Sequence, residues 1–305
     1  MLSTEKINSN SQWISVFEPL PNERQALINK YEVTQEMLGY AIDPYEKARV
    51  EVDPAAGVTL LIFDVYVPTH SQASAQTAPI GIMLTRNNLI TFTNAQTNFV
   101  NGLIAKELAL LQKNGSISDR FNLVFPVLYQ LSTAYFGPLR KADQQRQQLQ
   151  ESLGKHTARK AITEMTEIET GLVYILTSLK GNVSLLEELK RRYPDLSTKQ
   201  QNDLDDVIVE AQQGLEMAQM TSDVSERVSN AYTKVLDSNL NETMKFLTVY
   251  SIVLSIPTIV SGFYGENVKT LPFANSAFAW QITVLIALIL MGICLWIMFN
   301  KRWWH

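Results

Sequence analysis

Two long apolar segments near the end of the chain contrast with its earlier part, where charged and apolar residues are mixed. Residues 246–263 carry no charge over 18 positions, and residues 277–299 carry none over 23. At about 1.5 Å per residue, each is long enough to cross roughly 30 Å of bilayer hydrocarbon as a helix. The pattern predicts transmembrane helices at 243–263 and 277–299, joined by an extracytoplasmic loop at 264–276.

The first segment has a polar stripe that the second lacks. Small and polar residues recur along it at alternating steps of three and four, which places them on one face of a helix. Such residues also favour tight helix packing, but the length of the stripe favours a water-filled path shared by several copies of the chain. The second segment is expected on the lipid side. The residues predicted to line the pore are Asn241, Met244, Thr248, Ser251, Ser255, Thr258 and Gly262.

The part of the chain before these segments predicts a sheet flanked by helices. Five β-rich runs ("WISVF", "ARVEV", "VTLLIFDVYV", "IGIMLT" and "LITFT") are separated by Pro, Gly and Asn turns, with one helix-like stretch beginning at Pro21. Residues 95–193 are helical by period. We therefore expect an α/β domain, an α/β/α sandwich with a helical arm, over residues 1–195.

A long stalk helix is predicted at 196–242. From Ser197 onward no strong helix breaker occurs before Pro257, so the stalk should continue directly into the first membrane helix. Its acidic residues are either a solvated face or a divalent-ion sensor between subunits. The candidates for metal sensing are Asp203, Asp205 and Asp206.

Composition narrows the class of protein further. The 305 residues carry a formal charge of -4 with no basic stripe, which argues against nucleic acid as a partner. The N-terminus has no apolar leader, and residues 300–305 form a basic-aromatic tail typical of a cytoplasmic interface. We expect a multi-pass protein of the cytoplasmic (inner) membrane with both termini in the cytosol. Three distant histidines and no catalytic motif predict no enzyme and no tightly bound cofactor.

The loop between the two apolar segments carries the candidate chemistry. Tyr264, Gly265, Glu266 and Asn267 follow the polar stripe directly. Copies of Glu266 around an axis would concentrate cations, and Asn267 carbonyls could hydrogen-bond the water shell that Mg2+ gives up reluctantly. The predicted metal contacts are thus outer-sphere, from Asn267 and Glu266. Gly265 is expected to allow a tight turn.

These residues resemble the CorA-type metal-ion transporters, the two-transmembrane GxN family. The resemblance rests on the run from Asn241 to Thr248, a span with a proline, and Tyr264-Gly265-x-Asn267, where the family usually has Tyr-Gly-Met-Asn. The runs "VTLLIFDVYV" and "IGIMLTRNNLITFTN" are similar to the family's cytosolic sheet, and "KRWWH" is similar to its tail.

The resemblance implies a homopentameric funnel whose first membrane helices line the pore and whose second form an outer ring. It also implies transport of Mg2+, often Co2+ or Ni2+, and in one branch Zn2+. This sequence departs from the family pattern at three positions. Glu266 replaces the usual Met, Pro257 lies one place late, and Ser255 stands where a bulky apolar gate residue is usual.

The regulatory part of the family pattern is incomplete. The family's sensing carboxylate falls at about Asp206, but its partner would fall near Thr69 or His70, where there is no acid. The acid that would complete the family's sensing site is therefore missing from this sequence, and closure by Mg2+ stays an open alternative even where transport is retained.

The function expected from the sequence is uptake of divalent cations, and Mg2+ is the expected substrate. Copies of the chain are expected to associate within the lipid bilayer to form the path for the ion. Two alternatives stay open. One is Zn2+ or proton-coupled transport, as in a ZntB-like branch, with Glu266 as the titrating group. The other is a CorA-like membrane sensor or scaffold that does not transport.

Overall fold

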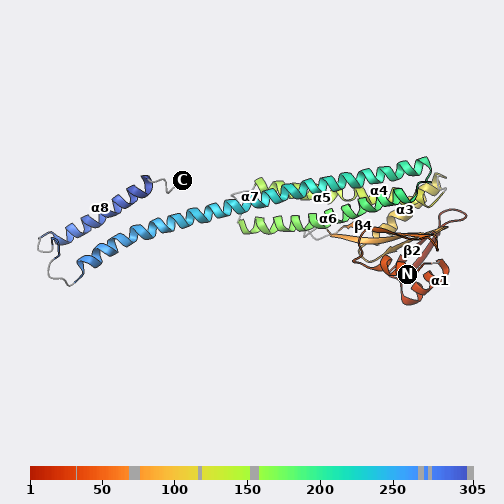
Figure 1. Cartoon of the computed structure of the whole chain (residues 1–305), viewed down its shortest axis with the longest axis horizontal. Helices are drawn as coiled ribbons and strands as arrows, with labels where there is room; N and C mark the ends of the chain where they lie inside the picture. The colour runs from red at the N-terminus through yellow and green to blue at the C-terminus, as the bar shows by residue number, and fades with distance from the viewer. Residues whose placement is uncertain are drawn as a thin grey trace. The chain divides into compact units, whose positions relative to one another are not determined.

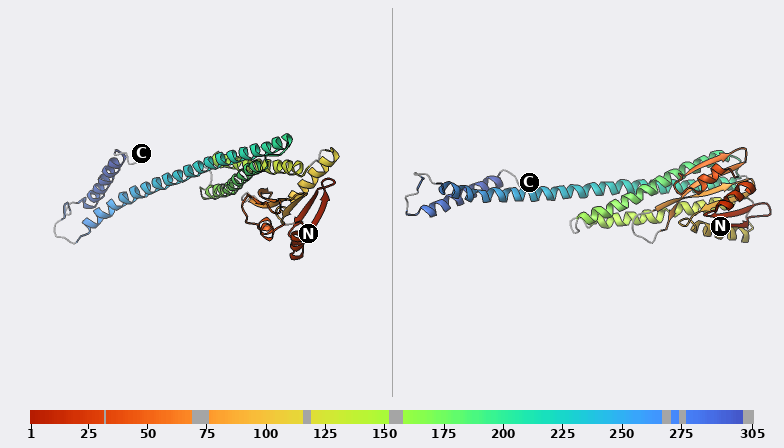
Figure 2. Two further views of the ribbon diagram at one scale, coloured as in Figure 1. Left: turned by 45° about the vertical axis from the view of Figure 1, so that its right-hand side comes forward. Right: turned by 90° about the horizontal axis from the view of Figure 1, so that it is seen from below.

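The structure is a computed structural model. It describes residues 1–31, 33–68, 76–115, 119–151, 158–266, 271–273 and 277–300. Two compact units divide the chain, Met1–Ser229 and Asn230–His305. Figures 1 and 2 show the chain in three views. Asn267, Thr69, the three histidines and the tail after residue 300 lie outside the described residues.

The first unit contains one mixed β-sheet. The described strands are β1 (Leu2–Lys6), β2 (Gln12–Phe17), β3 (Arg49–Asp53), β4 (Val58–Val67), β5 (Gln76–Leu84) and β6 (Asn88–Thr93). They lie in the order β1-β2-β6-β5-β4-β3, and all neighbours are antiparallel except β2 and β6. The five predicted runs all form strands. The sequence did not reveal β1, because four of its five residues are exposed and show no apolar alternation.

Helices cover both faces of this sheet, as the side chains of β4 show. Leu60 and Ile62 belong to one buried cluster with residues of α1 (Pro21–Tyr31) and α2 (Gln35–Ile42). Leu61 and Phe63 belong to a second cluster with residues of α3 (Phe99–Lys113), α4 (Phe121–Thr133) and α6 (Ala158–Arg192). Successive strand residues point to opposite faces, so a strand covered on both sides reads as a continuous apolar run. The predicted α/β/α sandwich is confirmed (Figure 1).

The structure sets the ends of the predicted helices and divides one of the predicted stretches in two. The stretch that begins at Pro21 forms α1 and α2, and the Thr34 hydroxyl caps α2 by accepting from the Met37 N–H at 3.2 Å. In the predicted arm, the described helices are α5 (Phe136–Glu151) and α6. Periodicity identified the helical state, but it could not locate these ends, which depend on caps and loops.

The predicted continuity of the stalk and the first span is present. Helix α7 (Thr198–Tyr264) runs for 67 residues and includes Pro257. The second unit contains the end of α7 and α8 (Ala279–Asn300). In the described part of the chain, these two helices are long and apolar enough to cross a membrane.

Candidate functional site

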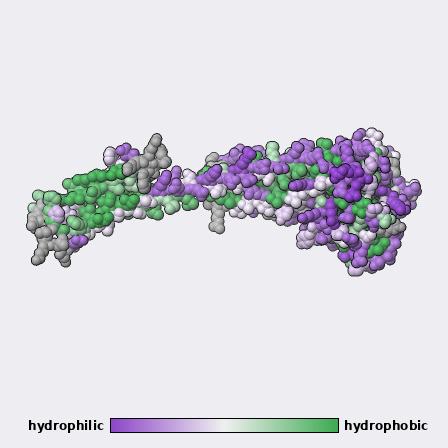
Figure 3. Space-filling model, viewed as in Figure 1, coloured by the Kyte–Doolittle hydropathy of each residue, from purple (hydrophilic) through white to green (hydrophobic). Residues whose placement is uncertain are grey.

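The apolar parts of α7 and α8 are exposed rather than buried. Only 6% of the most apolar 18-residue window of each helix is buried inside the protein, whereas a soluble core helix would be mostly covered. Figure 3 shows hydrophobic residues gathered over α8 and the adjoining end of α7. Bare apolar surface on this scale requires a nonaqueous environment or further protein. This observation excludes a pair of buried soluble helices.

The polar stripe lies on the side of α7 that α8 leaves open. Its seven residues, from Asn241 to Gly262, are all exposed. The less exposed residues of this part of α7 are Lys245, Val249, Val253, Ile256, Pro257, Val260 and Tyr264. At 3.6 residues per turn, the two sets fall on nearly opposite faces. In this unit α8 is the neighbouring described helix, and it has a matching covered face with buried Ala287 and Met298.

The hydroxyl groups of the stripe all donate their hydrogens to backbone carbonyls of α7. Thr248 Oγ1 donates to the Met244 carbonyl at 2.8 Å, and Ser251 Oγ donates to the Leu247 carbonyl at 2.8 Å. Ser255 and Thr258 donate likewise to carbonyls of the preceding turn, at 2.7 and 3.4 Å. Each hydroxyl thus uses its only hydrogen within the helix, which leaves oxygen lone pairs to face outward. A row of acceptor oxygens suits a cation or its water shell.

Gly265 lies in a turn directly after α7, which ends at Tyr264. Its N–H donates to the carbonyls of Ser261 at 2.9 Å and Gly262 at 3.1 Å, and its φ is not positive. A Cβ at this position would lie 3.1 Å from the Ser261 oxygen. Glycine is therefore favoured at this turn by its close approach to the last turn of α7, and not by a left-handed backbone. Glu266 follows and is exposed, whereas Tyr264 is half-buried and packs edge-on against Phe263 at 5.7 Å.

The three stalk carboxylates have different surroundings. Asp205 Oδ1 lies 2.6 Å from Nζ of Lys190 on α6, while Asp206 is exposed and Asp203 is half-buried. The described residues contain no group of three or more His, Cys, Asp or Glu side chains able to hold a metal ion. A metal sensor at these positions would therefore need ligands from outside the described residues of one chain. The sequence did not reveal Lys190, which lies 15 residues before Asp205 and reaches it only through helix packing.

A carboxylate that the sequence did not single out lies between the sheet and the arm. Asn182 of α6 accepts from the Asp64 N–H at 2.9 Å and donates to the Asp64 carbonyl at 2.8 Å. The buried Tyr135 hydroxyl donates to the same carbonyl at 2.8 Å. Burial raises the pKa of Asp64 from 3.8 to about 6, and a hydrogen bond from Ser178 opposes the shift. The sequence signal for this contact is the position of Asp64 among the apolar residues of β4.

The α/β unit, the 67-residue helix α7 and the exposed apolar lengths of α7 and α8 together define a class of protein. It is the class of membrane proteins that carry a large α/β domain beside two membrane-spanning helices. The sequence matches the CorA-like Mg2+ transporter family over residues 8–302, and the chain belongs to that family. Its members transport ions and are not enzymes, so the protein is a divalent-cation transporter.

Individual relatives agree with this assignment. The chain is 22% identical over 294 residues to the cobalt/magnesium transport protein CorA of Methanocaldococcus jannaschii, covering 95% of this chain and 90% of the relative. The complete structure of the CorA magnesium transporter from that organism superposes with a TM-score of 0.78 at 22% identity, covering 96% of this chain and 92% of the other. The cytoplasmic domain of ZntB from Vibrio parahaemolyticus has a TM-score of 0.61 at 11% identity, covering 77% and 93%. At 22% and 11% sequence identity, the structural likeness shows a shared fold and nothing further.

Proposed function

We propose that the protein is a homopentamer that carries hydrated Mg2+ through a pore lined by the polar stripe of α7. The observation that supports this most directly is that all seven stripe residues are exposed on the face opposite α8. One helix cannot enclose a path, so the stripe needs copies of itself around a common axis, and closed cyclic assemblies are the usual solution. In that arrangement α8 would form the outer, lipid-facing ring.

Topology in the membrane follows from the same arrangement. The α/β unit and both termini would lie in the cytosol, and the loop at 264–276 would face outward across the cytoplasmic membrane. The membrane potential then favours cation entry by about 2.3 kcal/mol per charge per 100 mV, doubled for a divalent ion. A potential that is negative inside therefore drives uptake without another energy source.

The ion is selected, in this proposal, where the stripe meets Gly265, Glu266 and Asn267. The exposed Glu266 would concentrate cations, and Asn267 would contact the water shell of the ion. Mg2+ is placed first because the family and the Methanocaldococcus jannaschii relative carry that name. Co2+ and Ni2+ are expected as further substrates, since the family resemblance implies both and the Methanocaldococcus jannaschii relative is named a cobalt/magnesium transport protein.

Ion-resolved flux into liposomes tests the proposal. Wild-type pentamers should take up Mg2+ when the inside is negative, and Asn267→Ala should reduce uptake at least about tenfold, or about 1.4 kcal/mol. Asn275→Ala changes the same residue type in the same loop and should leave flux unchanged. Background flux from folded pentamers of the wild type and of Asn267→Ala alike would reject transport and favour a sensor or scaffold.

Zn2+ or proton-coupled transport is the second candidate, because Glu266 adds a titratable group where the family usually has Met. Under this alternative, Glu266→Gln abolishes the pH dependence of flux and lowers Zn2+ uptake relative to Mg2+. An unchanged pH profile in the variant would reject proton coupling through Glu266. The comparison Glu266→Met tests selectivity, because restoring the usual residue should sharpen preference for Mg2+.

A further inference from the structure

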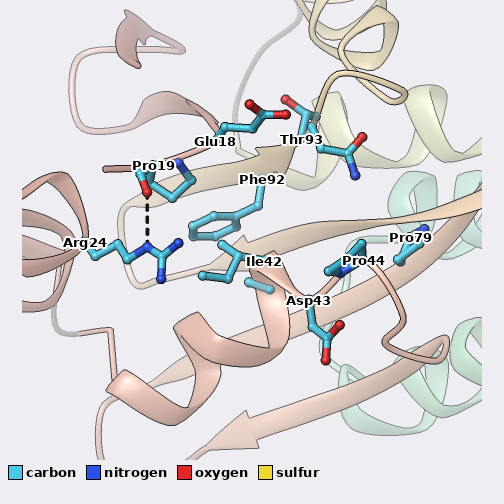
Figure 4. Close-up of a pocket in the computed structure, with 11 residues that line it drawn as sticks. Glu18, Pro19, Arg24, Ile42, Asp43, Pro44, Pro79, Phe92 and Thr93 are labelled. Carbon is cyan, nitrogen blue, oxygen red and sulfur yellow. Dashed lines mark hydrogen bonds between the residues drawn. The ribbon is translucent and has the colours of Figure 1, made fainter. Parts of the chain in front are cut away.

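A small cavity opens at the ends of β2 and β6 in the α/β unit. Its volume is about 200 Å³, and Figure 4 shows the side chains around it. Glu18 and Pro19 follow β2, while Thr93 and Asn94 end and follow β6. None of the stripe or loop residues described above lines this cavity. It is therefore separate from the proposed ion path.

The topology of the sheet explains why a cavity forms at this place. Strands β2 and β6 are adjacent and parallel, so their carboxyl ends meet at the same edge. The chain leaves β2 for α1, on one face of the sheet, and leaves β6 for α3, on the other. Two connections that diverge to opposite faces leave a crevice outside the strand ends, which is where open α/β sheets usually bind ligands.

Charges of opposite sign border the cavity without neutralising each other. Arg24 donates through Nε to the Pro19 carbonyl at 3.1 Å, which directs its guanidinium toward Phe92 and Ile42 (Figure 4). Asp43 accepts the Tyr45 N–H at 2.9 Å through Oδ1. Among the described residues, neither side chain is in an ion pair. The Arg24 η nitrogens and Asp43 Oδ2 therefore have capacity for a ligand.

The remaining lining limits the kind of ligand. Phe92, Ile42 and three prolines give the cavity an apolar wall. Glu18 adds a second acid and accepts the Ala95 N–H at 3.1 Å, with a backbone φ of 41° that non-glycine residues adopt rarely. Two acids beside one arginine disfavour phosphates and other polyanions. The volume is below that of sites for drug-sized ligands, which usually begin at about 300 Å³.

We propose that this cavity binds a small neutral amino acid as its zwitterion. The ligand carboxylate pairs with the Arg24 η nitrogens, a geometry for which guanidinium is well suited. The ligand ammonium pairs with Asp43, and an apolar side chain lies against Phe92 and Ile42. This inference goes beyond transport, because it assigns a cytosolic-domain ligand that need not pass through the pore.

Calorimetric titration of the full-length protein in detergent tests the proposal with three probes that share one apolar tail. L-Leucine carries both charged groups, isocaproate lacks the amine, and isoamylamine lacks the carboxylate. Leucine should bind, and each analogue should bind at least about tenfold more weakly, which corresponds to about 1.4 kcal/mol. The measurement involves no flux, so its outcome is independent of the transport proposal.

Three variants test whether Arg24 and Asp43 each contribute to leucine binding. Arg24→Gln and Asp43→Asn should each weaken leucine binding at least about tenfold. Lys30→Gln removes a charge from the same helix as Arg24, away from the cavity lining, and should leave binding unchanged. Isocaproate that binds as well as leucine, with Asp43→Asn inert, would overturn the proposal. So would isoamylamine that binds as well, with Arg24→Gln inert, or the absence of leucine binding to folded wild-type protein.

Discussion

Lys190 Nζ and Asp205 Oδ1 are 2.6 Å apart and join α6 to α7 within the α/β unit. Both side chains are about half exposed, so the pair should contribute less than about 1 kcal/mol to stability. Its larger consequence is chemical, because a fixed cation already neutralises one of the carboxylates that the sequence offered as a metal sensor.

Replacing Lys190 should therefore change the response to Mg2+ more than it changes stability. Lys190→Gln frees Asp205, and we expect protection of the stalk from limited proteolysis at several-fold lower Mg2+ than in the wild type. Arg192→Gln breaks a nearby pair with Glu188 on the same helix and serves as the control. Equal Mg2+ dependence in all three proteins would show that Asp205 takes no part in metal sensing.

The pKa of Asp64 predicts how stability depends on pH. The folded-state pKa is about 6 and the ordinary value is 3.8, so the folded protein binds the proton more tightly. The free energy of unfolding should therefore fall as pH rises from about 4 to about 6 and then level off. At neutral pH, Asp64→Asn should stabilise the protein by up to about 3 kcal/mol.

Thermal melting of the full chain across pH measures this effect. Asp53→Asn is a matched control, because Asp53 is a half-buried acid at the end of β3 that accepts the backbone N–H groups of Ala55 and Ala56. A fall in the Asp64→Asn variant as steep as that in the wild type would contradict the assignment.

The hydroxyl row on α7 should matter for flux through its acceptor oxygens. Thr258→Val keeps the shape of the side chain and removes the oxygen, and we expect uptake to fall by up to about tenfold. Thr283→Val is the control, since Thr283 on α8 makes the same bond to its own helix, to the Ala279 carbonyl at 3.0 Å, outside the stripe. Similar flux in both variants would indicate that the stripe serves packing.

Gly265 should resist substitution more than a glycine elsewhere in the hairpin. An alanine Cβ would lie 3.1 Å from the Ser261 oxygen, so the end of α7 must shift and the loop with it. We expect Gly265→Ala to lower flux severalfold while the oligomer persists in size-exclusion chromatography. Gly292→Ala adds a methyl where nothing lies within 4 Å, and it should retain wild-type flux.

Local pattern predicted much of the fold. The β-rich runs marked five strands because a strand covered on both faces is apolar along its length, as β4 is. Helix ends were harder to predict from the sequence, since the separation of α1 from α2 depends on the Thr34 cap. The short strand β1 was missed because its pairing partner β2, and not its own residues, determines its conformation.

The polar stripe was predictable for the same reason, because residues at steps of three and four share one face of a helix by geometry alone. Its role as an ion path stays a prediction. The contacts between residues far apart in the chain could not be predicted from the sequence. Lys190 reaches Asp205 only because α6 packs on α7, and Asp64 is shielded only because Asn182 and Tyr135 converge on its strand.

The sequence by itself determined the two apolar helices, the polar stripe and the order of secondary structure, since these depend on period and composition within one segment. Tertiary structure decided which carboxylate is neutralised, which one is desolvated, why Gly265 is glycine, and where β2 and β6 leave a charged cavity. Burial, charge pairing and close approach depend on residues distant in the chain, and only the packed fold brings those residues together.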